Sequence, residues 1–67
     1  MKTIKIGDEK VTKKQYKERV SFLLNEILEY GVMEHQKDLE KLYDSVNGNE
    51  LYKIQCKVGD YVHNLNQ

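Results

Sequence analysis

The sequence predicts a small, mainly α-helical domain in which three helices pack with a short N-terminal β-hairpin. Three observations predict this class. A capping motif precedes a long stretch of apolar residues at helical spacing, two later stretches repeat that period, and a Gly-Asp pair separates two short apolar-containing segments near the N-terminus. Proline and serine-rich linkers are absent from the 67 residues, so we expect a single domain over 1–67.

The first helix begins at a capping box. Thr12 and Gln15 have the Thr-x-x-Gln spacing in which a hydroxyl and an amide satisfy exposed backbone donors. Val11 and Tyr16 have the spacing of a hydrophobic staple across that cap, and Gly31 supplies a left-handed stop. The predicted core face of this helix consists of Tyr16, Val20, Leu23, Leu24, Ile27, Leu28 and Tyr30.

A second helix is predicted from about residue 33, and Asn47-Gly48 is expected to end it. Its apolar residues form a narrow seam, namely Val32, His35, Leu39, Leu42, Tyr43 and Val46. Charges of alternating sign occupy its outer face at a spacing of three residues, as Glu34–Lys37–Glu40 and Asp38–Lys41–Asp44. Such pairs indicate a solvated surface, each contributing a few tenths of a kcal/mol.

The last segment admits two interpretations. As a helix it has Asn49 as N-cap and a seam of Leu51, Ile54, Val58, Tyr61, Val62 and Leu65. As a hairpin it would turn at Gly59-Asp60. We favour the helix, although a glycine inside it costs about 1 kcal/mol relative to alanine.

The first eleven residues predict a β-hairpin that turns at Gly7-Asp8 and sets Ile4 opposite Val11. An isolated hairpin is only marginally stable, so its apolar side chains must pack on a helix or on further strands. If the C-terminal segment is also a hairpin, the two form one antiparallel sheet under a helical hairpin. That arrangement is the α+β alternative.

The size of the chain predicts association. A short domain buries a small share of its surface, and the single cysteine, Cys56, excludes a disulfide within one chain. We therefore expect a homodimer or a tight complex with another protein. The lone thiol, the lack of a secretory pattern and the lack of a long apolar run predict a cytoplasmic protein that does not enter the membrane.

Catalytic and metal-binding residues are not predicted. Neither His35 nor His63 has a cysteine or a second histidine nearby, whereas zinc sites use such pairs at short spacing. Cys56 has no adjacent base and is expected to be a partly buried thiol. No phosphate-binding glycine loop is present. We expect no enzymatic activity and no cofactor.

Charge is distributed unevenly although the net charge is zero. Residues 1–20 carry seven basic and three acidic side chains, and residues 21–50 carry two basic and seven acidic ones. The basic excess includes a cluster at the start of the first helix, where the macrodipole favours negative charge: Lys10, Lys13, Lys14, Lys17 and Arg19. The cluster is a candidate patch for nucleic-acid phosphates, or a solvated face balanced by the acidic second helix.

Phe22 is the only phenylalanine and falls far from the apolar face of the first helix. Its neighbours on the helical wheel are Arg19, Glu26 and Glu29. Two interpretations stay open. Either the hairpin or a neighbouring helix covers Phe22, or its ring is an exposed anchor for a partner protein, and then these four residues form a candidate interface.

The sequence thus predicts a small non-enzymatic protein-binding module. The short, lysine-rich and proline-free chain resembles the small accessory proteins of bacteriophages and mobile elements, which implies an inhibitor or modulator of a bacterial host protein. The first alternative is a small nucleic-acid-binding regulator that uses the basic patch. The second is a self-associating assembly accessory protein.

Overall fold

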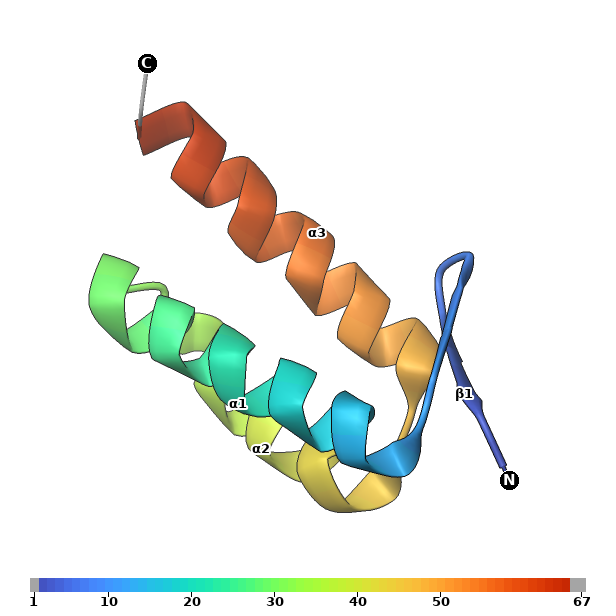
Figure 1. Cartoon of the computed structure of the whole chain (residues 1–67). Helices are drawn as coiled ribbons and strands as arrows, with labels where there is room; N and C mark the ends of the chain where they lie inside the picture. Colours follow the sequence, from blue (N-terminus) through green and yellow to red (C-terminus); the bar gives the residue numbers. More distant parts are fainter. Residues whose placement is uncertain (1, 66–67) are drawn as a thin grey trace.

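The computed structural model describes residues 2–65 and confirms the predicted fold class (Figure 1). A β-hairpin of β1 (Ile4–Ile6) and β2 (Glu9–Val11) precedes α1 (Lys13–Tyr30). A short 3-10 helix, η1 (Met33–His35), leads into α2 (Gln36–Ser45), and α3 (Gly48–Leu65) ends the described chain. Helices α1 and α2 run side by side in opposite directions, and α3 diverges from them away from the hairpin (Figure 1).

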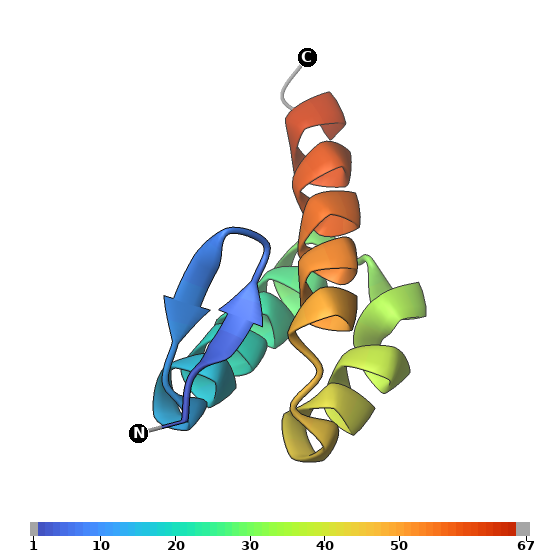
Figure 2. The same ribbon diagram turned by 90° about the vertical axis from the view of Figure 1, so that its right-hand side faces the viewer.

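The hairpin has the predicted register, with Ile4 paired to Val11. Gly7 adopts a φ of +61°, as hairpin turns with glycine in the first turn position require. The ring of Tyr52 from α3 lies against this turn, so that a Cβ on Gly7 would come within 2.6 Å of it. In the side view β1 runs next to the start of α3, and β2 lies on the outer side (Figure 2).

Helix α1 begins and ends where the local signals predict. The Thr12 hydroxyl accepts a hydrogen bond from the Gln15 N–H at 3.2 Å, and the Gln15 side chain accepts one from the Thr12 N–H at 2.9 Å. Val11 and Tyr16 are both buried, as a hydrophobic staple requires. Gly31 is left-handed at φ +76° and donates to the Ile27 carbonyl.

The junction between α2 and α3 differs from the prediction. Val46, rather than Asn47-Gly48, ends α2, with a φ of +52° that is unusual for a β-branched residue. The Asn47 side chain accepts a hydrogen bond from the Glu50 N–H at 3.2 Å, so Asn47 caps α3 in place of the predicted Asn49. The α3 helix therefore starts at Gly48, two residues earlier than an Asn49 cap implies.

Gly48 starts α3 because the backbone of β1 approaches it closely. A Cβ at this position would lie 2.1 Å from the Lys5 carbonyl oxygen. The glycine expected to stop one helix thus provides the contact between the next helix and the hairpin. Because residues 48–65 are helical, the described chain contains one two-stranded sheet, and the α+β alternative is wrong.

The core forms where the hairpin and the three helices meet. Its largest fully buried side chains are Tyr16, Val20, Ile27, Leu39, Leu51 and Val58. Tyr43, predicted to face the core, is exposed beside Lys17 near the hairpin end of the molecule. At the other end the predicted core faces extend too far, since Leu28, Tyr30, Tyr61 and Leu65 are exposed. These side chains follow the helical period, but the diverging helices leave them uncovered.

Candidate functional site

Phe22 lies near the middle of α1 and is 65% exposed. It points away from the side of α1 that carries the buried residues Val20, Leu23 and Ile27. The hairpin covers an earlier part of α1 and leaves the ring in solvent. Within residues 2–65, neither the hairpin nor a neighbouring helix therefore covers the ring, and its role as an anchor for a partner stays a prediction.

An open hollow of about 780 Å³ lies beside Phe22, between α1, α3 and β2. Arg19, Phe22, Leu23 and Glu26 line it from α1, and Gln55 and Gly59 line it from α3. Gly59 adds depth, because a Cβ placed there would meet no atom within 4 Å. An aromatic ring at the rim of a hollow offers both a projection and a recess to a bound molecule.

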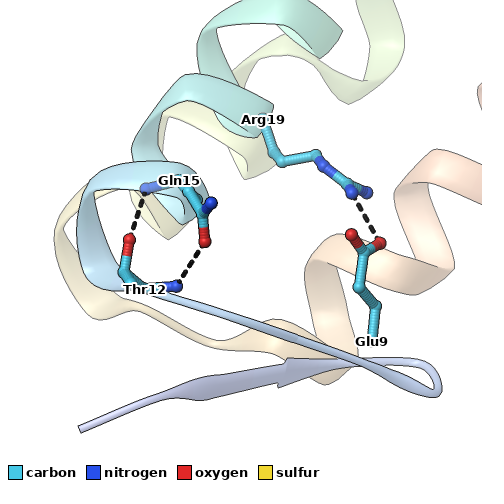
Figure 3. Close-up of polar contacts among 4 residues, drawn as sticks. All are labelled: Glu9, Thr12, Gln15 and Arg19. Atoms are coloured by element: carbon cyan, nitrogen blue, oxygen red, sulfur yellow. Dashed lines mark hydrogen bonds and ion pairs between the residues drawn. The ribbon is translucent and has the colours of Figure 1, made fainter. Parts of the chain in front are cut away.

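Arg19 connects this surface to the hairpin. Its guanidinium donates to the Glu9 carboxylate of β2 at 2.5 Å, close to the capping box (Figure 3). Both side chains are partly exposed, so the pair contributes no more than about 1 kcal/mol to stability. The pair joins β2 to α1 at the hollow, which both residues line.

Three carboxylates accompany Phe22 on the outward side of α1. Glu26 and Glu29 were predicted there, whereas Glu18 was missed. Residues four apart on a helix are neighbours, and this i, i+4 spacing from Glu18 to Phe22 is the signal that could have found it. Within residues 2–65 none of the three carboxylates has a hydrogen-bond or ion-pair partner.

The five residues of the predicted basic patch differ in their contacts. The Arg19 side chain pairs with Glu9, and the Lys17 ammonium lies 4.9 Å from the centre of the Tyr43 ring on α2. A cation over an aromatic face at that distance is a stabilising contact between helices. The other three members are exposed on β2 and at the start of α1, namely Lys10, Lys13 and Lys14.

The remaining chemical groups are dispersed. His35 is partly buried beside the Glu34 carboxylate at 3.4 Å, whereas His63 is exposed on α3. Cys56, predicted to be partly buried, is exposed because it lies on the outward side of α3. A hydrogen bond with the Cys56 thiol raises the pKa of Tyr52. Among the described residues, no three His, Cys, Asp or Glu side chains are placed to hold a metal ion.

Comparison of the chain with protein-family models, with curated proteins and with solved structures finds no match. Over residues 2–65, no helix combines the length and the apolar character needed to cross a membrane.

Proposed function

We propose that this protein is a non-enzymatic protein-binding module that binds another protein through the surface around Phe22. The observation that carries the proposal is the 65% exposure of an aromatic side chain in the middle of a helix. Exposed aromatic residues are enriched among the few that dominate the energy of protein interfaces. The surface comprises the predicted residues Phe22, Arg19, Glu26 and Glu29, together with Glu18.

The position of Phe22 on α1 supports a role in binding rather than in folding. Its α1 neighbours Leu23 and Ile27 are buried in the core, so the backbone under the ring is held in place. A rigid aromatic side chain loses little conformational entropy when a partner covers it. The hollow beside the ring offers a recess for a side chain of the partner.

The mode of action we propose is occupation of a surface on the partner, which blocks or alters what that surface does. The short, lysine-rich and proline-free chain resembles accessory proteins of bacteriophages and mobile elements. We accordingly propose a bacterial host protein as the partner, and inhibition or modulation as the outcome.

Affinity capture from a bacterial lysate tests the proposal when three forms are compared by quantitative mass spectrometry. The forms are wild type, Phe22→Ala and Leu28→Ala. Leu28 is the matched control, because it is also an apolar α1 residue and is 55% exposed on another side of the helix. We expect proteins retained by wild type and Leu28→Ala to be lost from Phe22→Ala, with its melting temperature nearly unchanged.

Two results would contradict the proposal. One is that Phe22→Ala retains the same proteins as wild type. The other is that Phe22→Ala unfolds the domain, since removal of a buried phenylalanine costs about 3 kcal/mol or more whereas removal of an exposed one does not.

A further inference from the structure

We propose that the Phe22 surface binds a cationic protein segment, in which lysine or arginine side chains flank an apolar side chain. This inference rests on the proposed function and names the chemistry of the partner. Three carboxylates lie around Phe22, namely those of Glu18, Glu26 and Glu29. The inference rests on their negative charge and on the repulsion that the alternative partners would meet there.

The carboxylates bracket Phe22 along the helix. Glu18 and Glu26 lie four residues before and after it, which places each about 6 Å away along the axis. Glu29 lies seven residues after it, about 10 Å away. A partner that covers the ring must therefore place its own side chains beside negative charge on both sides of the ring.

The fold itself makes no use of these charges. None of the three carboxylates has a partner among residues 2–65, and Glu26 and Glu29 are like-charged neighbours at i, i+3. The outer face of α2 alternates in sign at the same spacing, as a face adapted only to solvent does. Glu29 also stands in the last turn of α1, where the helix dipole disfavours an anion.

Neither a nucleic acid nor an anionic membrane fits this surface. Both would bring phosphate groups close to three carboxylates, so their binding would be opposed by the charge repulsion that basic nucleic-acid-binding surfaces avoid. Of the two basic residues that line the hollow, Arg19 is already paired with Glu9, and Lys10 lies on β2, outside α1.

A second copy of the chain bound through the same face does not fit either. An antiparallel pairing of two α1 helices about Phe22 sets Glu18 of one copy against Glu26 of the other, because both lie four residues from the centre. A parallel pairing sets each glutamate against its own equivalent. Like charges placed together at an interface oppose binding, which leaves a partner of opposite charge.

A library of random peptides displayed on yeast tests the inference. Cells are selected for binding to the wild-type protein and depleted of those that also bind Phe22→Ala. We expect the remaining peptides to carry net positive charge with an apolar residue between basic ones. Neutral or acidic peptides that depend on Phe22 would overturn this inference and leave the proposed function standing. A selection that yields no Phe22-dependent peptide would overturn both.

Charge variants then test which carboxylates attract the selected peptide. We expect the triple change Glu18→Gln, Glu26→Gln and Glu29→Gln to weaken its binding by about tenfold, and added salt to weaken wild-type binding in the same direction. The matched control removes three negative charges elsewhere, through Asp38→Asn, Asp44→Asn and Asp60→Asn, and should change the affinity by less than about threefold. Equal effects of the two triple variants would overturn the inference, because the attraction would then follow net charge alone.

A gel-shift experiment at low salt forms the last arm. We expect Phe22→Ala to leave any retardation of DNA or RNA unchanged. If wild type retards DNA or RNA and Phe22→Ala does not, nucleic acid binds this surface and the inference is overturned.

Discussion

The two ends of the molecule are held together in different ways. At the hairpin end, contacts join segments that are distant in sequence: Gly48 lies against the Lys5 backbone, and the Tyr52 ring lies against the Gly7 turn. The buried hydroxyl of Tyr16 donates to the Leu42 carbonyl at 2.7 Å and accepts from the Asn47 N–H at 3.0 Å. Every element except η1 contributes to this end.

At the opposite end the polar contacts of residues 27–35 are local. The Gly31 and Val32 N–H groups both donate to the Ile27 carbonyl, and His35 contacts its neighbour Glu34. Exposed apolar side chains gather on this end, including Leu28, Met33, Tyr61 and Leu65. In Figure 2 the last turns of α3 stand clear of the other elements.

The contacts that stabilise the fold are thus concentrated at the hairpin end, and most of the exposed apolar side chains lie at the other end. Contacts at the hairpin end fix the angle between α1 and α3, and the helices that diverge from it leave side chains uncovered. Phe22 stands between the two ends, on a helix whose first turns are firmly held. Substitutions at the hairpin end should therefore affect unfolding strongly, and those at the other end should affect it little.

The largest expected effect comes from Gly48→Ala. The new Cβ would overlap the Lys5 carbonyl and push β1 away from α3, at a loss of about 3 kcal/mol in the free energy of unfolding. Gly59→Ala is the matched control in the same helix. Its Cβ meets no atom within 4 Å, so the gain in helix propensity should stabilise the domain by about 1 kcal/mol. Urea unfolding measures both, and two changes of the same sign would refute the packing assigned to Gly48.

Tyr16→Phe should have the next largest effect. Loss of the hydroxyl removes a hydrogen bond to the Leu42 carbonyl and leaves the partly buried Asn47 N–H without its acceptor, at a cost of about 1–3 kcal/mol. Urea unfolding at neutral pH checks this value. A loss below about 0.5 kcal/mol would mean that water replaces the hydroxyl and that the contact does not hold this end together.

The same residue predicts a dependence on pH. Burial raises the pKa of Tyr16 in the folded state, against the smaller opposing effect of the Asn47 N–H. The unfolded chain then loses this proton first, so stability should fall as the pH rises above about 10. The decline should be steeper in wild type than in Tyr16→Phe. Parallel pH profiles of the two proteins would argue against a buried phenol.

Thr12→Ala should have a moderate effect of about 1 kcal/mol, because it removes the acceptor for the Gln15 N–H at the start of α1. Thermal unfolding provides the measurement. Thr3→Ala is a control of the same chemistry outside any helix or strand, and it should change the melting temperature little.

The smallest effect is expected at the opposite end, from Leu65→Ala. This side chain is 55% exposed where α3 extends beyond its neighbours, so the loss should stay within about 0.5 kcal/mol. Urea unfolding of this variant completes the comparison. A loss as large as that of Tyr16→Phe would show that both ends hold the fold equally.

Features that depend on neighbours in sequence were predicted from sequence alone. The capping box, the staple of Val11 on Tyr16, the left-handed Gly31 and the pairing of Ile4 with Val11 all form within a few residues. Helical periodicity also predicted α3, over the competing hairpin at Gly59-Asp60. Such features follow from side-chain chemistry at short range, which the order of residues specifies directly.

The remaining features required the tertiary structure. A helical period shows which residues share a face. The angle between α1 and α3 decides how much of that face the neighbouring helix covers, and Leu28 and Leu65 stay exposed. The same packing leaves Phe22 exposed instead of covered by the hairpin or a neighbouring helix. At the α2–α3 junction, the approach of β1 requires a glycine at the start of α3, which moves the left-handed position to Val46 and the cap to Asn47. These outcomes depend on contacts between residues tens of positions apart, and no local pattern in the sequence encodes them.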